Sequence, residues 1–222
     1  MSAAAPIKVE IWSDIACPWC YLGKRRFEAA VAQFAQEAGA PAVQASYRSF
    51  QLSPDLPADF SGSHVEYLGS KLGWSPEQVA QADQRLQSLG APYGIAYNYD
   101  INRVVNTHKA HQLLHYAKAH GAQAQVKDLL LKAFFSDGVD LSQLESLADV
   151  AQAAGLDRAD ALRALQQQEY ADAVEQDKAQ AARYGISGVP FFVIDGRYGL
   201  SGAQEPETFL QALRQAAAQE DA

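Results

Sequence analysis

Apolar positions along the chain follow two different spacings, and the change between them outlines its organisation. Residues 7–13 form a short β-branched run that is typical of a buried strand. After Cys17 the apolar residues recur at helical spacing, which predicts a helix that ends at Gly39. A second strand is expected over residues 43–50, before a proline-rich breaker segment. These elements form the first half of a strand–helix–strand unit with a parallel sheet.

The middle of the chain, from about His64 to Arg183, has helical spacing almost throughout. Ser142 and Glu145 form a capping-box pattern that predicts a helix start. The aromatic stretch 93–99 is expected to be extended, with its tyrosines either in the core or along a substrate groove. The other helices are expected over residues 76–90, 104–120, 123–135 and 157–184.

Strand patterns return near the C-terminus. Residues 189–194 are apolar, Asp195-Gly196 is a strong hairpin signal, and residues 198–200 supply the returning strand. A last helix is expected over residues 206–218. The pattern therefore predicts an α/β fold, in which a strand–helix frame made of residues 1–55 and 185–222 carries a helical insert at residues 56–184.

The composition narrows the classes of function. The 222-residue chain is 48% hydrophobic, which is ample for a globular core, and it has a net charge of −8. Its longest basic run is the triplet Lys24-Arg25-Arg26, so nucleic acid is not expected as a partner. Residues 1–6 lack the features of a signal peptide, and no apolar stretch approaches the ~20 residues of a membrane span. We therefore expect a cytoplasmic protein without a membrane partner.

The only two cysteines lie in one motif, Cys17-Pro18-Trp19-Cys20, shortly after the first strand. Two thiols separated by two residues can form a disulfide within one helical turn, and proline suits that turn because it lacks an N–H group. A helix N-terminus would stabilise the Cys17 thiolate and lower its pKa below the free value of about 8.5. C-x-x-C beside a βα unit is typical of redox proteins, so a reactive dithiol is expected.

Metal binding and a purely structural role have less support. A structural zinc ion needs about four ligands, and the chain has no second C-x-x-C or nearby C-x-H pair. A purely structural disulfide between the two cysteines would add little to the stability of the fold, because it would close so short a loop. Three histidines share one helical face without an H-E-x-x-H pattern, so no metal is expected. We assign instead Asn106, His108 and His111 to polar contacts with the substrate beside the dithiol.

Four segments taken together resemble one known family. They are residues 13–23, 106–111, 188–192 and 200–204. This combination resembles the DsbA class of thioredoxin-fold proteins and, more narrowly, its FrnE-like branch. The resemblance implies a thioredoxin fold with a large inserted all-helical domain, and a cis Val189–Pro190 peptide that faces Cys17.

The resemblance also implies a function. Proteins of this class exchange thiols and disulfides, so Cys17 is expected as the nucleophile and Cys20 as the resolving thiol of a mixed disulfide. Trp19 stands where DsbA proteins usually carry histidine, which predicts a milder oxidant. The expected partners are protein thiols or disulfides, with no cofactor and with glutathione as a candidate reducing partner. The residues expected to bind the substrate chain are Pro18, Trp19, Val189 and Pro190.

Proton transfer has no obvious carrier in the sequence. Thioredoxins have a buried acid six residues before the first cysteine, whereas this chain has Ile11 at that position. Asp14 is the nearest carboxylate, although a loop residue that accepts hydrogen bonds from backbone N–H groups is the simpler role for it. Proton handling must therefore come from elsewhere or from water.

Two other functions stay open at this stage. Relatives of this fold include glutathione-dependent transferases and isomerases of small aromatic compounds. Those enzymes typically keep a serine or a lone thiol at the first position, and Cys20 would then be unnecessary. A non-catalytic binding module on a redox fold is the third interpretation. The direction of exchange, the natural substrate, the recycling partner and the oligomeric state also stay open.

Overall fold

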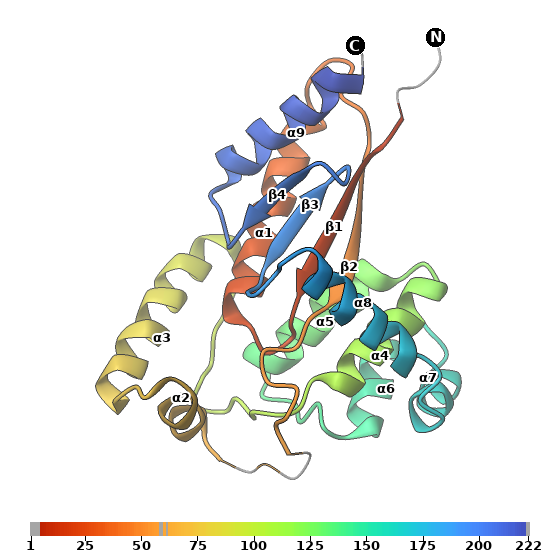
Figure 1. Ribbon diagram of the computed structural model, residues 1–222. Helices are drawn as coiled ribbons and strands as arrows, with labels where there is room; N and C mark the ends of the chain where they lie inside the picture. The colour runs from red at the N-terminus through yellow and green to blue at the C-terminus, as the bar shows by residue number, and fades with distance from the viewer. Residues whose placement is uncertain (1–4, 58–59, 61, 221–222) are drawn as a thin grey trace.

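The computed structural model describes residues 5–57, 60 and 62–220. Its four-stranded sheet has the order β2–β1–β3–β4 (Figure 1). β1 runs parallel to β2 and antiparallel to β3, so the N-terminal strand–helix–strand unit and the C-terminal hairpin share one sheet. This confirms the predicted α/β frame. The strands are β1 (Ile7–Ser13), β2 (Val43–Ser49), β3 (Phe191–Ile194) and β4 (Tyr198–Ser201).

Two helices cover one face of the sheet (Figure 1). α1 (Pro18–Phe34) connects β1 to β2, and α9 (Pro206–Glu220) packs beside it. The rings of Phe27, Phe192 and Phe209 contact one another at the centre of the core between helices and sheet. α1 ends at Phe34 rather than at Gly39, because Phe34 is the last residue on its buried face.

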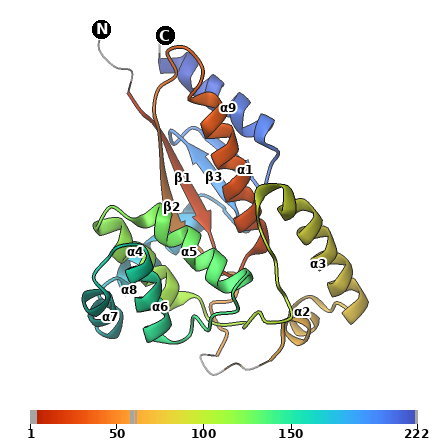
Figure 2. The same ribbon diagram turned by 180° about the vertical axis from the view of Figure 1, so that it is seen from behind.

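The remaining helices lie between β2 and β3 in sequence and gather at the carboxyl end of β1 (Figures 1 and 2). α4 is central to this group, because it contacts four of the other helices. α8 and α5 also pack against β2, which joins the helical part to the sheet. The helices are α2 (His64–Leu72), α3 (Pro76–Gly90), α4 (His108–Ala119), α5 (Gln123–Phe135), α6 (Leu144–Ala153), α7 (Arg158–Gln166) and α8 (Ala171–Arg183).

The start of α4 and the aromatic stretch before it differ from the sequence prediction. α4 begins at His108 rather than at residue 104, because the Asn106 side chain accepts a hydrogen bond from the His108 N–H at 2.9 Å. The stretch 93–99 is not a strand, since a 3-10 turn, Ala91–Tyr93, leads into irregular chain. The rings of Tyr97 and Tyr99 stack at 5.7 Å within the helical core, so the core is confirmed as their location.

The predicted capping box at the start of α6 is wrong. The helix begins at Leu144, and the residue before it makes no side-chain cap. Ser142 hydrogen-bonds with the carboxylate of Asp140 instead, so its hydroxyl is not available to the helix. Glu145 pairs with Arg158 at 2.7 Å. Ser142 and Glu145 therefore bond to Asp140 and Arg158, and not to the start of the helix as the sequence pattern predicts.

The hairpin between β3 and β4 follows the sequence prediction. Asp195 and Gly196 have φ values of 48° and 66°, the positive pair that a two-residue type I′ turn requires. Asp195 also accepts a hydrogen bond from the backbone N–H of Lys8 at 2.7 Å, which ties the turn to β1. β3 begins after Pro190, because proline cannot donate to the strand ladder.

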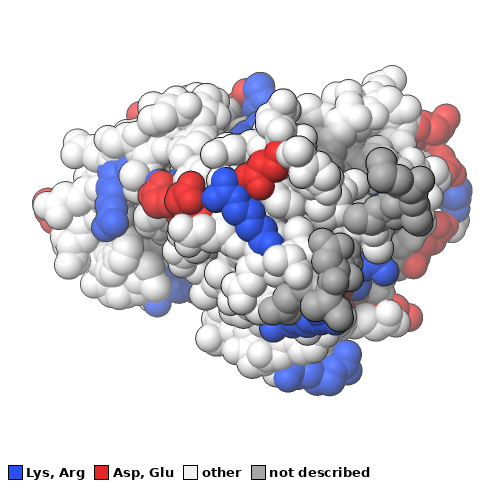
Figure 3. All heavy atoms as spheres, turned by 90° about the horizontal axis from the view of Figure 1, so that it is seen from above, with Lys and Arg blue, Asp and Glu red and all other residues white. Residues whose placement is uncertain are grey.

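Charges are mixed on the face that carries both ends of the chain. Lysine and arginine side chains alternate there with acidic ones among many uncharged residues (Figure 3). Within the described ranges, no helix is both long and apolar enough to cross a membrane.

β2 is an edge strand, and a glutamine from α5 completes its hydrogen bonding. Gln123 accepts a hydrogen bond from the Tyr47 N–H and donates one to the Tyr47 carbonyl, each at 2.9 Å. A single side chain thus takes the place of a neighbouring strand. Because the site is buried, these backbone groups would otherwise lack both water and a partner.

We expect Gln123→Ala to destabilise the protein by about 2–6 kcal/mol, since two buried backbone groups would lose their partners at about 1–3 kcal/mol each. Urea unfolding at neutral pH measures the effect. Gln125→Ala is the matched control, because Gln125 is exposed on the same helix and should change the free energy of unfolding by less than about 0.5 kcal/mol. Equal effects of the two variants would contradict the capping role.

Candidate active site

The two cysteines lie where the sheet frame meets the helical part. Cys17 is the N-cap of α1, with extended backbone angles of −93° and 111°, and Pro18 is the first helical residue. Both thiols are free and almost fully buried, with exposures of 3% for Cys17 and 1% for Cys20. The chain turns sharply from β1 into α1 here, so the dithiol stands at the carboxyl end of a central strand.

The loop before β3 faces the first cysteine. The Val189–Pro190 peptide is cis, as the resemblance implied, and the Val189 carbonyl oxygen lies 3.5 Å from the Cys17 sulfur. Gly23 allows this close packing, because a Cβ at that position would lie only 2.9 Å from Cγ of Pro190. Gly23 therefore leaves the space that the loop with Pro190 occupies.

The two thiols differ in acidity. The hydrogen bond to the Cys20 sulfur, together with burial, raises the pKa of Cys17 well above its usual value. Burial also opposes ionisation of Cys20, but the S–H of Cys17 and the charge of Lys127 outweigh it and lower the pKa of Cys20. The direction of the pKa shift for Cys17 is the opposite of the lowering that the helix start predicts, because the two buried thiols share a hydrogen bond.

The dipeptide between the cysteines has one exposed and one anchored residue. Trp19 is 36% exposed, and the Arg85 guanidinium lies 5.9 Å from its ring centroid. The Pro18 carbonyl accepts a hydrogen bond from the Tyr97 hydroxyl at 2.6 Å. Tyr97 thus fixes the first turn of α1 from the helical part, a role that the sequence did not reveal.

Asp14 joins three segments just before the dithiol. Its carboxylate accepts hydrogen bonds from the backbone N–H groups of Ile15 at 2.7 Å and Leu52 at 2.8 Å, and Nε2 of His111 lies 3.1 Å away. Burial opposes its charge, but His111 and the backbone donors outweigh burial and lower the pKa of Asp14. The simple role predicted for Asp14, an acceptor for backbone N–H groups, is confirmed, with the histidine as an additional partner.

The structure separates the three polar residues predicted to contact the substrate. His111 is fully buried, so its polar contact is with Asp14 and not with a surface ligand. The Asn106 amide donates to the carbonyls of Pro54 and Leu56, and so holds the loop after β2. His108 is partly exposed, as is Asn106, and lies 3.5 Å from Glu175.

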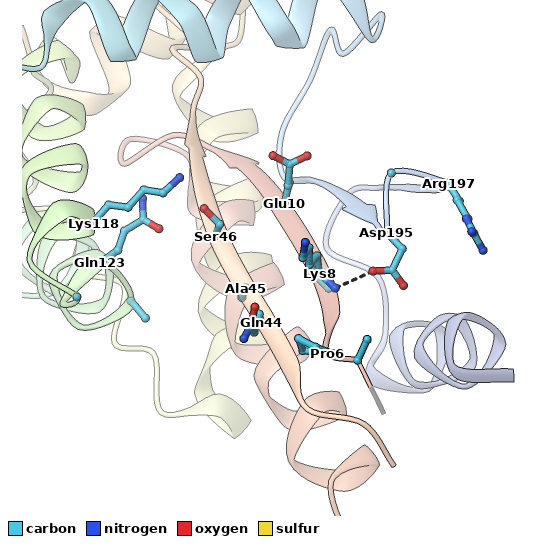
Figure 4. Close-up of a pocket in the computed structure, with 15 residues that line it drawn as sticks. Pro6, Lys8, Glu10, Gln44, Ala45, Ser46, Lys118, Gln123, Asp195 and Arg197 are labelled. Atoms are coloured by element: carbon cyan, nitrogen blue, oxygen red, sulfur yellow. Dashed lines mark hydrogen bonds between the residues drawn. The ribbon is translucent and has the colours of Figure 1, made fainter. Parts of the chain in front are cut away.

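Two hollows lie outside the dithiol. One, of about 550 Å³, is bounded by Gln51, Asn106, His108, Glu175 and Lys178. A broader and open one, of about 1600 Å³, lies over the amino-terminal halves of β1 and β2, where Lys8 and Glu10 point away from the α1 face (Figure 4). This second hollow is at the opposite end of β1 from the cysteines. Across the part of the chain that the structure describes, no cluster of His, Cys, Asp and Glu side chains is placed to hold a metal ion.

Lys127 is the main feature of the site that sequence analysis missed. It lies on α5 with its side chain fully buried, and its charge acts on both thiols. A signal for it existed, because Lys127 falls between Val126 and Leu130 on the apolar face of that helix. A lysine in an apolar stripe is unusual enough to mark a functional position.

The buried His111 gives the protein a specific pH dependence. Burial lowers the pKa of His111 below its usual 6.5, although Asp14 acts in the opposite direction. As pH falls below about 6.5, the unfolded chain binds a proton that the folded His111 does not, so stability decreases. We expect His111→Gln, which does not titrate, to flatten this loss between roughly pH 6.5 and 5.

Urea unfolding of the reduced protein across that pH range measures the change in slope. His120→Gln serves as control, because His120 is exposed at the end of the same helix. The burial argument would be refuted if both variants kept the wild-type pH dependence.

Comparison with known proteins places this geometry in a family. The model of the DSBA-like thioredoxin domain matches residues 8–214. The crystal structure of a probable DsbA oxidoreductase from Streptomyces coelicolor is 41% identical with a TM-score of 0.87, and the match covers 95% of this chain and 89% of that one.

Two more distant structures share the fold. A 2-hydroxychromene-2-carboxylate isomerase is 18% identical, with a TM-score of 0.66 over 96% of this chain and 98% of that one. The cytosolic disulfide reductase DsbM from Pseudomonas aeruginosa is 16% identical, with a TM-score of 0.64 over 94% and 97% of the two chains. The expected thioredoxin fold with an inserted helical part is thereby confirmed. The chain belongs to the DSBA-like thioredoxin domain family and is an oxidoreductase of the DsbA class.

Proposed function

We propose that this protein exchanges disulfides with protein substrates through Cys17 and Cys20. The observation that carries the proposal is the pairing of two free thiols at a helix start, with the Cys17 sulfur 3.5 Å from the Val189 carbonyl. A purely structural disulfide would not need a backbone carbonyl beside one of its sulfur atoms. An extended substrate chain would use this carbonyl, because the carbonyl and its neighbours can form hydrogen bonds with the substrate backbone.

The acidities of the thiols suggest which sulfur the substrate meets. When a substrate thiolate attacks the disulfide at Cys17, a bond forms between the two sulfurs and the Cys17–Cys20 bond breaks. The electron pair leaves on Cys20, and a thiol with a lowered pKa is the faster leaving group. A second substrate thiolate then releases Cys17, so that the substrate gains a disulfide and the enzyme becomes a dithiol. The reverse sequence reduces a substrate disulfide: Cys17 attacks it, Cys20 resolves the mixed disulfide, and an external thiol reduces the Cys17–Cys20 disulfide that forms. Cys17 is thus the substrate-facing sulfur and Cys20 the internal one.

Substrate contacts fall on the surface around Cys17. We assign Trp19, Pro18 and the Val189–Pro190 loop to the substrate chain, since Trp19 offers an exposed ring beside the dithiol. His108 borders the smaller hollow, outside the dithiol, and we assign it to a farther part of the substrate chain. Asn106 and His111 are assigned to positioning, because their polar atoms are engaged with the protein itself. The residues also support the FrnE-like branch, which rests on the segments around Cys17, Asn106 and Pro190.

Glutathione is the reducing partner we propose, with a cytoplasmic location. Support comes from the structure of DsbM, a cytosolic disulfide reductase that has been solved with glutathione. A glutathione-dependent transferase or isomerase activity on small aromatic compounds is less well supported, because such chemistry needs no second thiol. The presence of Cys20 beside Cys17 therefore favours exchange.

Serine variants of the two cysteines separate these functions. Cys17→Ser should lower the turnover of protein disulfides about 10³-fold or more, because the substrate-facing sulfur is lost. Cys20→Ser should accumulate mixed disulfides with the substrate, because nothing resolves them. Insulin reduction with glutathione measures turnover, and non-reducing gels with mass spectrometry detect the trapped complex.

The double variant, Cys17→Ser with Cys20→Ser, is the control and should trap nothing. Full disulfide turnover in the Cys17 variant would refute the exchange function. Retention of an isomerase activity by Cys20→Ser, without mixed disulfides, would favour the alternative.

A further inference from the structure

Lys127 is a buried cation that has no hydrogen-bond partner within the described part of the molecule. Its side chain is 0% exposed, and Nζ makes no hydrogen bond. An isolated ammonium in a protein interior is costly, so such a group is normally paired. The position therefore calls for a reason beyond packing.

A second buried lysine provides a direct comparison. Lys24 on α1 is 1% exposed, and its ammonium lies against the same Tyr47 ring as Lys127, each at 5.9 Å from the ring centroid. Lys24, however, is paired with Glu28 and, at 2.7 Å, with Asp128 of α5. Two ammonium groups thus share one environment, and carboxylates neutralise only one of them.

The Lys24–Asp128 pair also fixes where Lys127 stands. Asp128 follows Lys127 directly on α5, while Lys24 lies one turn after Cys20 on α1. The ion pair therefore joins the two helices at the level of the dithiol. α5 packs against β2 (Figure 2), and the Lys127 ammonium lies over the ring of Tyr47 on that strand.

The groups that face Lys127 come from each element around it. Among them, only the thiols and Asp14 can carry negative charge toward it at neutral pH, and Asp14 already has His111 and two backbone donors. The Cys20 thiolate is the strongest of these attractions, ahead of Asp14 and Cys17. The titratable groups are Cys17, Cys20 and Lys24 of α1, Asp14 of the preceding loop, Tyr47 of β2 and His111 of α4.

We propose that Lys127 is a positioning residue that supplies a counter-charge for the thiolate of the Cys17–Cys20 pair and thereby sets the redox poise of the dithiol. This deepens the proposed exchange function and rests on it. The charge of Lys127 matters most at one point of the exchange step. When a substrate thiolate forms a bond to Cys17, the Cys17–Cys20 bond breaks and its electron pair remains on Cys20, beside the ammonium.

The direction of the effect follows from linkage. Burial lowers the pKa of Lys127 to about 8, so the group is charged at neutral pH and loses its proton as pH rises through that value. The cation stabilises the reduced dithiol in its thiolate form and has no comparable effect on the neutral disulfide. A protein whose reduced form is stabilised is the stronger oxidant. Removing the charge should make the dithiol more reducing and its thiolate harder to form.

Lys127→Met, which keeps the length of the side chain without the charge, tests the proposal in the full-length protein. We expect the equilibrium constant for reduction by glutathione to fall about tenfold, which corresponds to a potential about 30 mV lower. The first ionisation of the dithiol, followed by thiolate absorbance against pH, should move up by about one pH unit. Thermal unfolding of the oxidised protein should show no loss of stability, because in that form the variant removes an uncompensated buried charge.

Lys24→Met is the matched control, since it removes a buried ammonium from the same tyrosine ring while Arg25 still pairs with Glu28 and Asp128. We expect its potential and its thiol titration to stay within twofold of wild type. If Lys127→Met does not fold, Lys127→Gln takes its place in the same measurements.

A wild-type potential and titration in the Lys127 variant would overturn the proposal, as would equal shifts in both lysine variants. Neither readout uses a protein substrate. Failure of the wild-type enzyme to act on protein disulfides would therefore count against the proposed function alone, and not against the role of Lys127.

Discussion

Helix α1 belongs to two hydrophobic cores at once, and the geometry of the dithiol at its start depends on that shared position. Farther along the helix, Phe27 and Phe34 pack against the sheet. At its start, Tyr21 and Leu22 pack into the core of the inserted helices. A movement of α1, which carries the dithiol at its start, would therefore disturb both cores. A rigid frame of this kind suits exchange chemistry, in which three sulfur atoms must lie nearly in line.

Buried polar contacts fasten the two parts of the fold to each other around the start of α1. Asp14 bonds to His111 across the junction, and Asp177 of α8 accepts the Ser49 N–H of β2 at 2.8 Å. Gln123 completes the edge of β2. Each contact pairs a group of the sheet frame with one of the inserted helices, and each would be costly to open because both partners are buried. The insert is thus held by hydrogen bonds of fixed geometry as well as by apolar area.

The frame could be predicted from the sequence because its signals are local. The β-branched run of β1, the proline after Cys17 and the Asp195-Gly196 turn each determine the backbone over a few residues. Contacts between distant segments could not be predicted in this way. The hydroxyl of Ser142 could bond either to the start of α6 or to the carboxylate of Asp140. Only the folded chain shows that it bonds to Asp140. The pairing of Asp14 with His111 likewise depends on how α4 crosses the loop, which no local pattern encodes.

The distribution of charge between the thiols is the clearest case of such a non-local effect. A helix start favours a thiolate on Cys17, and the sequence predicts no more than that. Burial of both sulfurs weakens this preference, while a lysine more than a hundred residues away in sequence favours Cys20. Within the proposed role of Lys127, the disulfide form of the protein carries the cost of an unpaired buried cation, and reduction relieves it by placing a negative charge beside it. Folding stability and redox potential are then linked, since the form that pairs the charge is both the more stable fold and the favoured redox state. Lys24 is neutralised by carboxylates in both the disulfide and the dithiol form, so its charge favours neither form.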